Sequence, residues 1–265
     1  MAISPIDKSQ RTAARIAGLA FPISFAIVVA VNFGIFARLI VTGNPAETAR
    51  NILAHETLFR IGIAGDMVYC VGVVVLLTAL YVILKPVSQN LALLAAFGRL
   101  VHGFTWLLIT LNLFTALRLL SDADYSHAFG PDQLPALALL YLSGYDAYYV
   151  GLLFWGLGAT VGSYLWFKSN YIPRALAAFG VISGAWCATC TFVFYIFPDF
   201  AKVVNLSWFD SPMAIFELAL SFWLLFKGLR PSGGSRVRQS EQLNTGQCAA
   251  REAFSAFRGE CLSHP

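Results

Sequence analysis

The sequence predicts an all-α fold, an integral membrane bundle of six transmembrane helices with short interfacial helices in the outer loops. Three observations predict it. Of the 265 residues, 58% are hydrophobic and 12% are charged, whereas about a quarter of a soluble domain is charged. Six apolar segments have lengths at or near that needed to cross a bilayer. The few polar residues inside them recur at helical spacing, which is typical of a face turned away from lipid.

The six predicted spans follow one another along most of the chain. The first resembles a signal peptide, but it is long enough to span and ends in no small-residue cleavage site, so we expect it to be retained. The sixth is short, and Trp208 and Phe209, which suit an interfacial aromatic belt, would extend it upstream. The spans are expected at residues 16–40, 61–84, 91–117, 145–167, 175–197 and 212–226.

Lysine and arginine predict the orientation. If the N-terminus is cytoplasmic, most basic residues fall on the inner side and the acidic loops on the outer side, in which we include Asp199 and Asp210. We therefore expect a bacterial inner (plasma) membrane protein with both termini cytoplasmic. Residues 1–15 would be a cytoplasmic segment, 16–230 the membrane domain and 231–265 a polar, disordered cytoplasmic tail. The basic exceptions to this pattern are Arg38, Arg50, Arg60, Arg118 and Lys202.

Two outer loops carry helix signals of their own. Asn44 is placed as an N-cap, with Pro45 at the first helical position and Glu47 closing a capping box. A surface-lying amphipathic helix is expected there. Residues 132–143 are apolar but too short to span, so we expect them to lie at the outer interface or fold back over the bundle.

Small residues predict how two of the spans pack. Gly158 and Gly162 in the fourth span, and Gly180 and Gly184 in the fifth, form small-xxx-small pairs that let helix backbones approach closely. We expect these two spans to pack together. Cys187 and Cys190 match a Cys-x-x-Cys pattern, but they lie mid-span with no second pair, which favours packing over redox chemistry.

A polar stripe marks the third span between residues 99 and 112. Arg99, His102, Thr105, Ile109 and Asn112 fall at steps of three and four, so four of the five positions on one helix face are polar. This face cannot look at lipid and is expected to line the interior of the bundle. Because the second and third spans run in opposite directions, Asp66 would reach His102 more easily than Arg99, with Arg60 as a rival partner from its own helix.

Two further carboxylates are candidate members of this interior. Glu217, in the last span, would pair with Arg99 or hydrogen-bond a neighbouring helix; if it faced Asp66, two acids would share one site and one would hold a proton. Asp146 lies at the outer mouth of the fourth span and would line a vestibule toward Asp66 and Glu217. The candidate binding residues are therefore Asp66, Arg99, His102, Glu217 and Asp146, and the candidate catalytic acids are Asp66 and Glu217.

The sequence carries no motif for a cofactor or for nucleic acid. His102 is compatible with metal binding, with a proton relay through Asp66 or with interhelical hydrogen bonding, but no His-x-x-x-His or Glu-x-x-His spacing occurs, so no metal is expected. No nucleotide loop, nucleophile elbow or haem motif is visible. The expected partners are the lipid bilayer and a small or lipophilic ligand, and no expectation follows for the oligomeric state.

Four stretches carry a family resemblance: FRIGIAGDMVYC, LYVILKPVSQNLALLAAFGRLVHG, YLWFKSNYIPRALAAFGVISG and ELALSFWLLFKG. As a linked set they resemble the bacterial multi-span membrane family of domain of unknown function four-three-eight-six, over about residues 11–228. The resemblance implies a multi-helix membrane protein. It places Asp66, Arg99, Arg174 and Glu217, with the Lys85-Pro86 turn, at recurrent polar positions of the family, and it implies no reaction.

Three functions stay open at this point. The first is a non-enzymatic membrane protein whose buried charges bind or move a small solute or a proton, although no inverted repeat is evident. The second is an intramembrane enzyme in which Asp66 or Glu217 is the acid, Arg99 holds an anionic head group and aromatic residues such as Trp106 and Trp155 wall a cavity for an isoprenoid or lipid substrate. The third is a scaffold whose paired charges fix helix register.

Overall fold

A computed structural model describes residues 6–121, 133–143, 146–197 and 199–230, and these residues contain helices and no strand. Six helical stretches are long and apolar enough to cross a membrane in the described part of the chain, as predicted. The 29 residues of the second stretch would extend about 43 Å at 1.5 Å per residue, against a hydrocarbon core of about 30 Å. The elements are α1 (Lys8–Val29), η1 (Ala30–Phe36), α2 (Ala37–Leu39), α3 (Pro45–Ala54), α4 (Glu56–Leu84), α5 (Gln89–Ser121), α7 (Gln133–Leu142), α8 (Asp146–Ser169), α9 (Arg174–Ile196), α10 (Phe200–Val203) and α11 (Leu206–Phe226).

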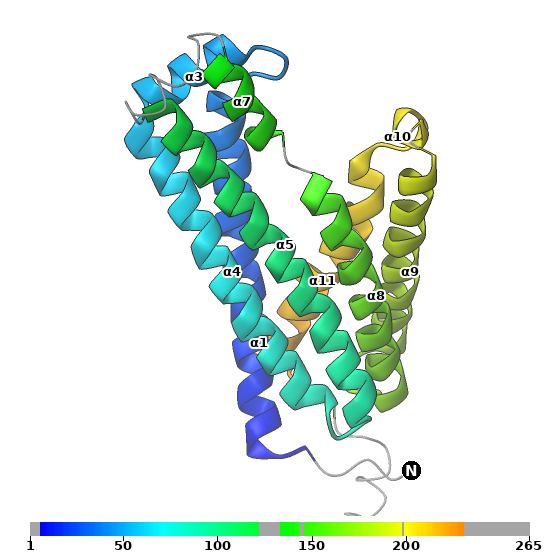
Figure 1. The fold of residues 1–265 in the computed structure, drawn as a ribbon. Helices are drawn as coiled ribbons and strands as arrows, with labels where there is room; N and C mark the ends of the chain where they lie inside the picture. The colour runs from blue at the N-terminus through cyan, green and yellow to red at the C-terminus, as the bar shows by residue number, and fades with distance from the viewer. Residues whose placement is uncertain (1–5, 122–132, 144–145, 198, 231–265) are drawn as a thin grey trace, which may run out of the picture.

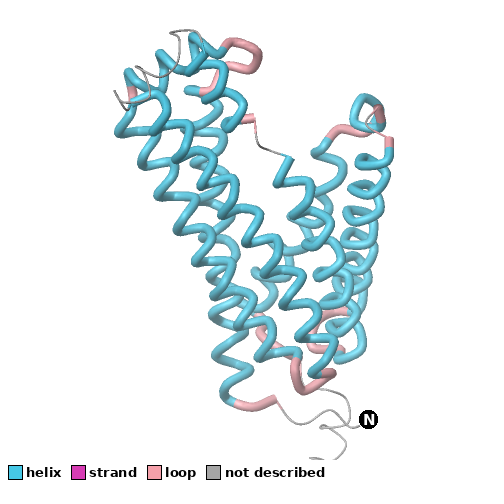
Figure 2. The backbone as a smooth tube through the Cα atoms, in the orientation of Figure 1, coloured by secondary structure: helices cyan, strands magenta, loops and turns pink. Residues whose placement is uncertain are grey.

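The long helices form two groups that meet at one end of the bundle (Figure 1). One group contains α1, α4 and α5, and the other contains α8, α9 and α11. The groups are joined through α5 packed on α8 and α1 packed on α11. They diverge toward the end that carries α3, α7 and α10, which we name the α3 end, and lie close together at the opposite end, where α1 begins (Figures 1 and 2). The polar residues of α5 therefore lie where the two groups are in contact.

Glycines set the closest approach between α8 and its neighbours. A Cβ atom added to Gly156 would lie 2.8 Å from the backbone nitrogen of Ala188, so α8 and α9 pack closely, as predicted. Gly184 takes part in this contact. Gly158 instead faces α5, where an added Cβ would lie 2.9 Å from the Ala95 carbonyl oxygen, and Gly180 faces Phe216 of α11. The expected glycine pairs thus serve three interfaces.

Short helices form in both loops where the sequence predicted them. Asn44 caps α3 by accepting from the Glu47 backbone N–H at 3.1 Å, but its side-chain amide, and not its backbone, donates to the Glu47 carboxylate. Most of the apolar segment predicted to lie at the interface or fold back forms α7 (Gln133–Leu142), which packs back on α5 and α3. The last helix includes Trp208 and Phe209, as expected. The π-helical turn η1 was not foreseen; its Phe36 ring packs where Gly62 of α4 leaves room.

Candidate functional site

Arg99 of α5 and Glu217 of α11 form a buried ion pair. Their residues are 8% and 9% exposed. Nη2 of Arg99 donates to Oε2 of Glu217 at 2.9 Å, and Nη1 donates to Oε1, so the pair is bidentate. Glu217 lies nine residues before the end of α11 and Arg99 ten residues after the start of α5, a rise of about 14–15 Å in each helix. The pair therefore sits near the middle of the apolar span.

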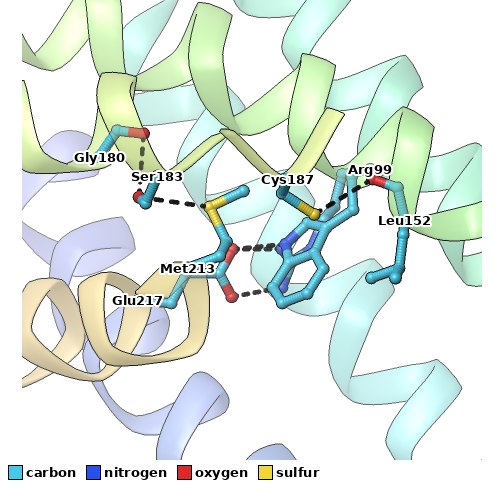
Figure 3. A network of polar contacts seen from close by, with 8 residues as sticks. Arg99, Leu152, Gly180, Ser183, Cys187, Met213 and Glu217 are labelled. Atoms are coloured by element: carbon cyan, nitrogen blue, oxygen red, sulfur yellow. Dashed lines mark hydrogen bonds and ion pairs between the residues drawn. The ribbon is translucent and has the colours of Figure 1, made fainter. Parts of the chain in front are cut away.

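Trp155 of α8 completes this unit. Its indole Nε1 donates to Oε1 of Glu217 at 2.8 Å, and the Arg99 guanidinium carbon lies 5.4 Å from the centre of the same indole. Both oxygens of Glu217 are therefore engaged, one by the guanidinium alone and one by the guanidinium and the indole; the close view shows Arg99 and Glu217 turned toward each other (Figure 3). Trp155 was expected only as a cavity wall, and its hydrogen bond ties α8 to α5 and α11.

His102 is directed toward α8. Its ring stacks on Trp155 with the ring centres 5.3 Å apart and an interplanar angle of 23°. Gly151 leaves room for it, since a Cβ added there would lie 3.0 Å from Nδ1 of His102. This nitrogen is buried and has no hydrogen-bond partner among the described residues. Within the described part of the chain, no hydrogen bond or ion pair joins His102 to Asp66, the contact that the helix depths suggested.

Asp66 of α4 is the second buried acid and stands apart from the ion pair. The residue is 1% exposed, and its Oδ1 has no hydrogen-bond partner among the described residues. The Trp106 indole lies beside the carboxylate, although its N–H has no hydrogen-bond partner among the described residues. Arg60, the rival partner, is bound to Glu56 at 2.7 Å on the exposed surface. Asp66 therefore has no cationic partner in the described chain.

Tyr69 lies three residues after Asp66 in α4, on the same face of the helix. It packs on Trp106 with the ring centres 4.9 Å apart, and it interacts electrostatically with Asp66, Arg99 and Glu217. Asp66 and the ion pair thus belong to one polar and aromatic network, and among the described residues no hydrogen bond or ion pair joins them.

Tyr148 and Asp210 extend this network toward the α3 end. The Tyr148 hydroxyl donates to Oδ2 of Asp210 at 2.8 Å, and the Tyr148 ring meets Trp106 edge to face at 5.6 Å. Asp210 was assigned to a loop, but it lies in α11. The signal that would have found it is its spacing: Asp210 precedes Glu217 by seven residues and so lies on the same helix face.

A small cavity reaches the ion pair from the side of α4, α5 and α8. It has a volume of about 60 Å³ and is lined by apolar side chains together with Arg99 and Ser163. At roughly 30 Å³ per molecule, this is room for about two waters. Nε of Arg99 and Oγ of Ser163 are buried without hydrogen-bond partners among the described residues. Asp66 does not line this cavity.

The remaining sequence candidates contribute no further contact. Asp146 begins α8, and its side chain lies outside the described residues. Cys187 is buried and donates to the Leu152 carbonyl oxygen at 3.8 Å (Figure 3), and Cys190 is buried and free, which agrees with packing. No group of three potential metal ligands occurs in the described part of the chain. Residues 231–265, with Cys248 and Cys261, lie outside the described residues.

The fold and this network define a polytopic α-helical membrane protein with a charged interior. The sequence model of the family described as domain of unknown function (DUF4386) matches residues 16–228. The chain belongs to this family, in agreement with the resemblance carried by the four stretches of its sequence. No curated protein and no solved structure matches the chain.

Proposed function

We propose that the protein binds and moves protons through its buried network, with Asp66 as the proton-binding group. The observation that carries this proposal is that the two buried acids differ in their hydrogen-bond donors. Glu217 has Arg99 and Trp155 as donors, whereas Oδ1 of Asp66 has none among the described residues. An intramembrane ionisable group without a fixed partner is a candidate for ion or proton binding.

The charge balance supports this assignment. The positive charge of Arg99 is matched by Glu217, so an ionised Asp66 would add an uncompensated negative charge to the interior. A charged side chain at the bilayer centre costs about 2.5–3.5 kcal/mol on insertion scales. A proton taken up by Asp66 removes this cost, and its release to a neighbouring group restores it.

The surroundings of Asp66 supply groups for proton transfer. Tyr69 interacts electrostatically with Asp66 and with the ion pair, and Tyr148 and Asp210 lie beyond Trp106 toward the α3 end. Hydroxyl and carboxyl groups exchange protons readily, and the Tyr148–Asp210 hydrogen bond gives this set a second carboxylate. We infer a path from the α3 end through Asp210 and Tyr148 to Asp66.

Proton flux into proteoliposomes tests the proposal. Purified protein is reconstituted, a potassium diffusion potential is imposed, and internal pH is followed with a trapped dye. We expect the wild type to conduct and D66N to fall to the level of protein-free liposomes. D199N is the matched control, because Asp199 is exposed and pairs with Lys202. Wild-type flux equal to that of empty liposomes, or equal flux in D66N and wild type, would refute the proposal.

The other two functions receive less support. Acid catalysis on a lipophilic substrate needs a free acid at the end of a cavity, but Glu217 is held by Arg99 and Asp66 does not line the cavity beside the ion pair. A scaffold that only fixes helix register predicts unchanged flux in D66N, so the same experiment separates it from the proposal.

We infer that both termini lie on the cytoplasmic side of a bacterial plasma membrane. The support is the charge distribution. At the end of the bundle where α1 begins, Asp7 is accompanied by eight exposed basic residues: Lys8, Arg11, Arg15, Lys85, Lys168, Arg174, Lys227 and Arg230. Labelling single cysteines at Lys168 and Lys202 with an impermeant thiol reagent in intact cells tests it: only the second should react.

A further inference from the structure

An apolar groove runs along the surface between α4 and α5. It is lined by Ile63, Ala64 and Met67 of α4 and by Leu107, Leu111 and Phe114 of α5, and Arg60 closes one end. Its volume of about 620 Å³ lies within the range of about 300–1,000 Å³ for small-molecule sites. The groove is separate from the buried network, since neither Asp66 nor Arg99 lines it.

The walls of this groove face the membrane and offer apolar contact. Met67 is 52% exposed and Leu111 is 58% exposed. Thr110, the polar residue between the two helices, donates its hydroxyl to the Trp106 carbonyl oxygen at 3.0 Å, so its polarity is satisfied within α5. From Arg60 to Met67 the α4 wall rises about 10 Å at 1.5 Å per residue. An extended hydrocarbon chain matches this shape and chemistry.

Two arginines flank one end of the groove. Arg60 belongs to the lining, and Arg118 lies one turn beyond Phe114 on the same face of α5, since Leu107, Leu111, Phe114 and Arg118 are spaced by four, three and four residues. Because α4 and α5 are antiparallel neighbours, both arginines lie toward the α3 end. Arg118 is exposed and makes no ion pair with a described residue, and the surface pair of Arg60 with Glu56 is weak.

We propose that this groove binds an anionic phospholipid, with one acyl chain between α4 and α5 and the phosphate on Arg60 and Arg118. The guanidinium fork suits bidentate contact with phosphate oxygens. The long arginine side chains reach the head-group level while their stems cover apolar surface. The proposal also gives a purpose to two of the arginines that break the charge pattern of the loops, and it does not depend on proton movement.

Native mass spectrometry of the detergent-solubilised protein, titrated with phosphatidylglycerol or phosphatidylcholine, tests the proposal. We expect the wild type to prefer phosphatidylglycerol. The double variant R60A/R118A should lose about 30-fold in phosphatidylglycerol affinity, which is about fivefold per arginine, and should lose the preference. The matched control R38A/R50A removes two exposed arginines near the same end that do not line the groove. It should retain the wild-type affinity for phosphatidylglycerol and the preference for this lipid.

Two further arms separate the alternatives. A64W places a large side chain in the groove, and because Ala64 is exposed the substitution leaves the buried core unchanged. This variant should bind both phosphatidylglycerol and phosphatidylcholine more weakly than the wild type. Free glycerol 3-phosphate in excess should fail to displace the lipid. Equal losses in R60A/R118A and R38A/R50A, unchanged lipid binding in A64W, or full displacement by glycerol 3-phosphate would each overturn the proposal.

Discussion

Breaking the buried Arg99–Glu217 pair should destabilise the bundle strongly. E217Q preserves the shape of the side chain and one acceptor oxygen for Trp155, but it leaves the Arg99 charge without a counterion. Removing one partner of a buried ion pair costs about 3–5 kcal/mol. With roughly 2–4 °C per kcal/mol for a protein of this size, the melting temperature should fall by about 6–20 °C.

Three buried cysteines allow thermal unfolding to be measured. Cys70, Cys187 and Cys190 are free and buried, so a thiol-reactive fluorogenic dye reports unfolding as they become exposed. The assay uses a background in which Cys248 and Cys261 are replaced by serine, so that the signal comes from the three buried thiols.

The double variant R99M/E217M is the decisive comparison. It removes both charges and fills the space with apolar side chains, and replacing a whole buried ion pair in this way is often neutral or stabilising. We expect it to melt above E217Q. Two results would contradict this reasoning: an E217Q protein with the melting temperature of the wild type, or an R99M/E217M protein with a melting temperature below that of E217Q. Either would show that an unpaired buried charge is not the cause of the lost stability.

Two further predictions concern contacts between helices. Y148F removes the hydrogen bond to Asp210 and should lower stability by about 1.5–3 kcal/mol; D210N and the double variant complete a cycle, and additive losses would argue against the contact. G156A places a methyl group 2.8 Å from the backbone of Ala188, which cannot give way easily, and should cost about 1–3 kcal/mol; G34A, where no atom lies within 4 Å, is the matched control and should melt well above it.

The helices were predictable because their signals are local. Span length and apolar composition are read within one segment, and the cap at Asn44 needs only the four residues that follow one another there. The number of spans, the short α7 and the upstream start of α11 therefore follow from the sequence. The π-helical turn η1 does not, because it depends on the room that Gly62 and Gly65 of another helix leave for Phe36 and Val31.

The partners inside the bundle were harder to predict because depth alone does not fix rotation. Asp66 and His102 fall at compatible depths, yet His102 faces α8, where Gly151 admits its ring against Trp155. The Arg99–Glu217 pair was among the alternatives, since few opposite charges exist in the spans. The donors on α8 were missed, because tryptophan and tyrosine are common in spans and their polar atoms leave no pattern in the sequence.

The two buried acids should respond in opposite ways to neutral substitution. A network that serves only packing would satisfy each of its polar atoms, but Oδ1 of Asp66, Nε1 of Trp106 and Nδ1 of His102 are buried without partners among the described residues. Each such group costs about 1–3 kcal/mol. D66N removes an uncompensated charge and should melt at or above the wild type while abolishing proton flux, whereas E217Q should melt far below it. If D66N instead melts as low as E217Q, the carboxylate of Asp66 stabilises the fold, and its assignment as the proton-binding group is wrong.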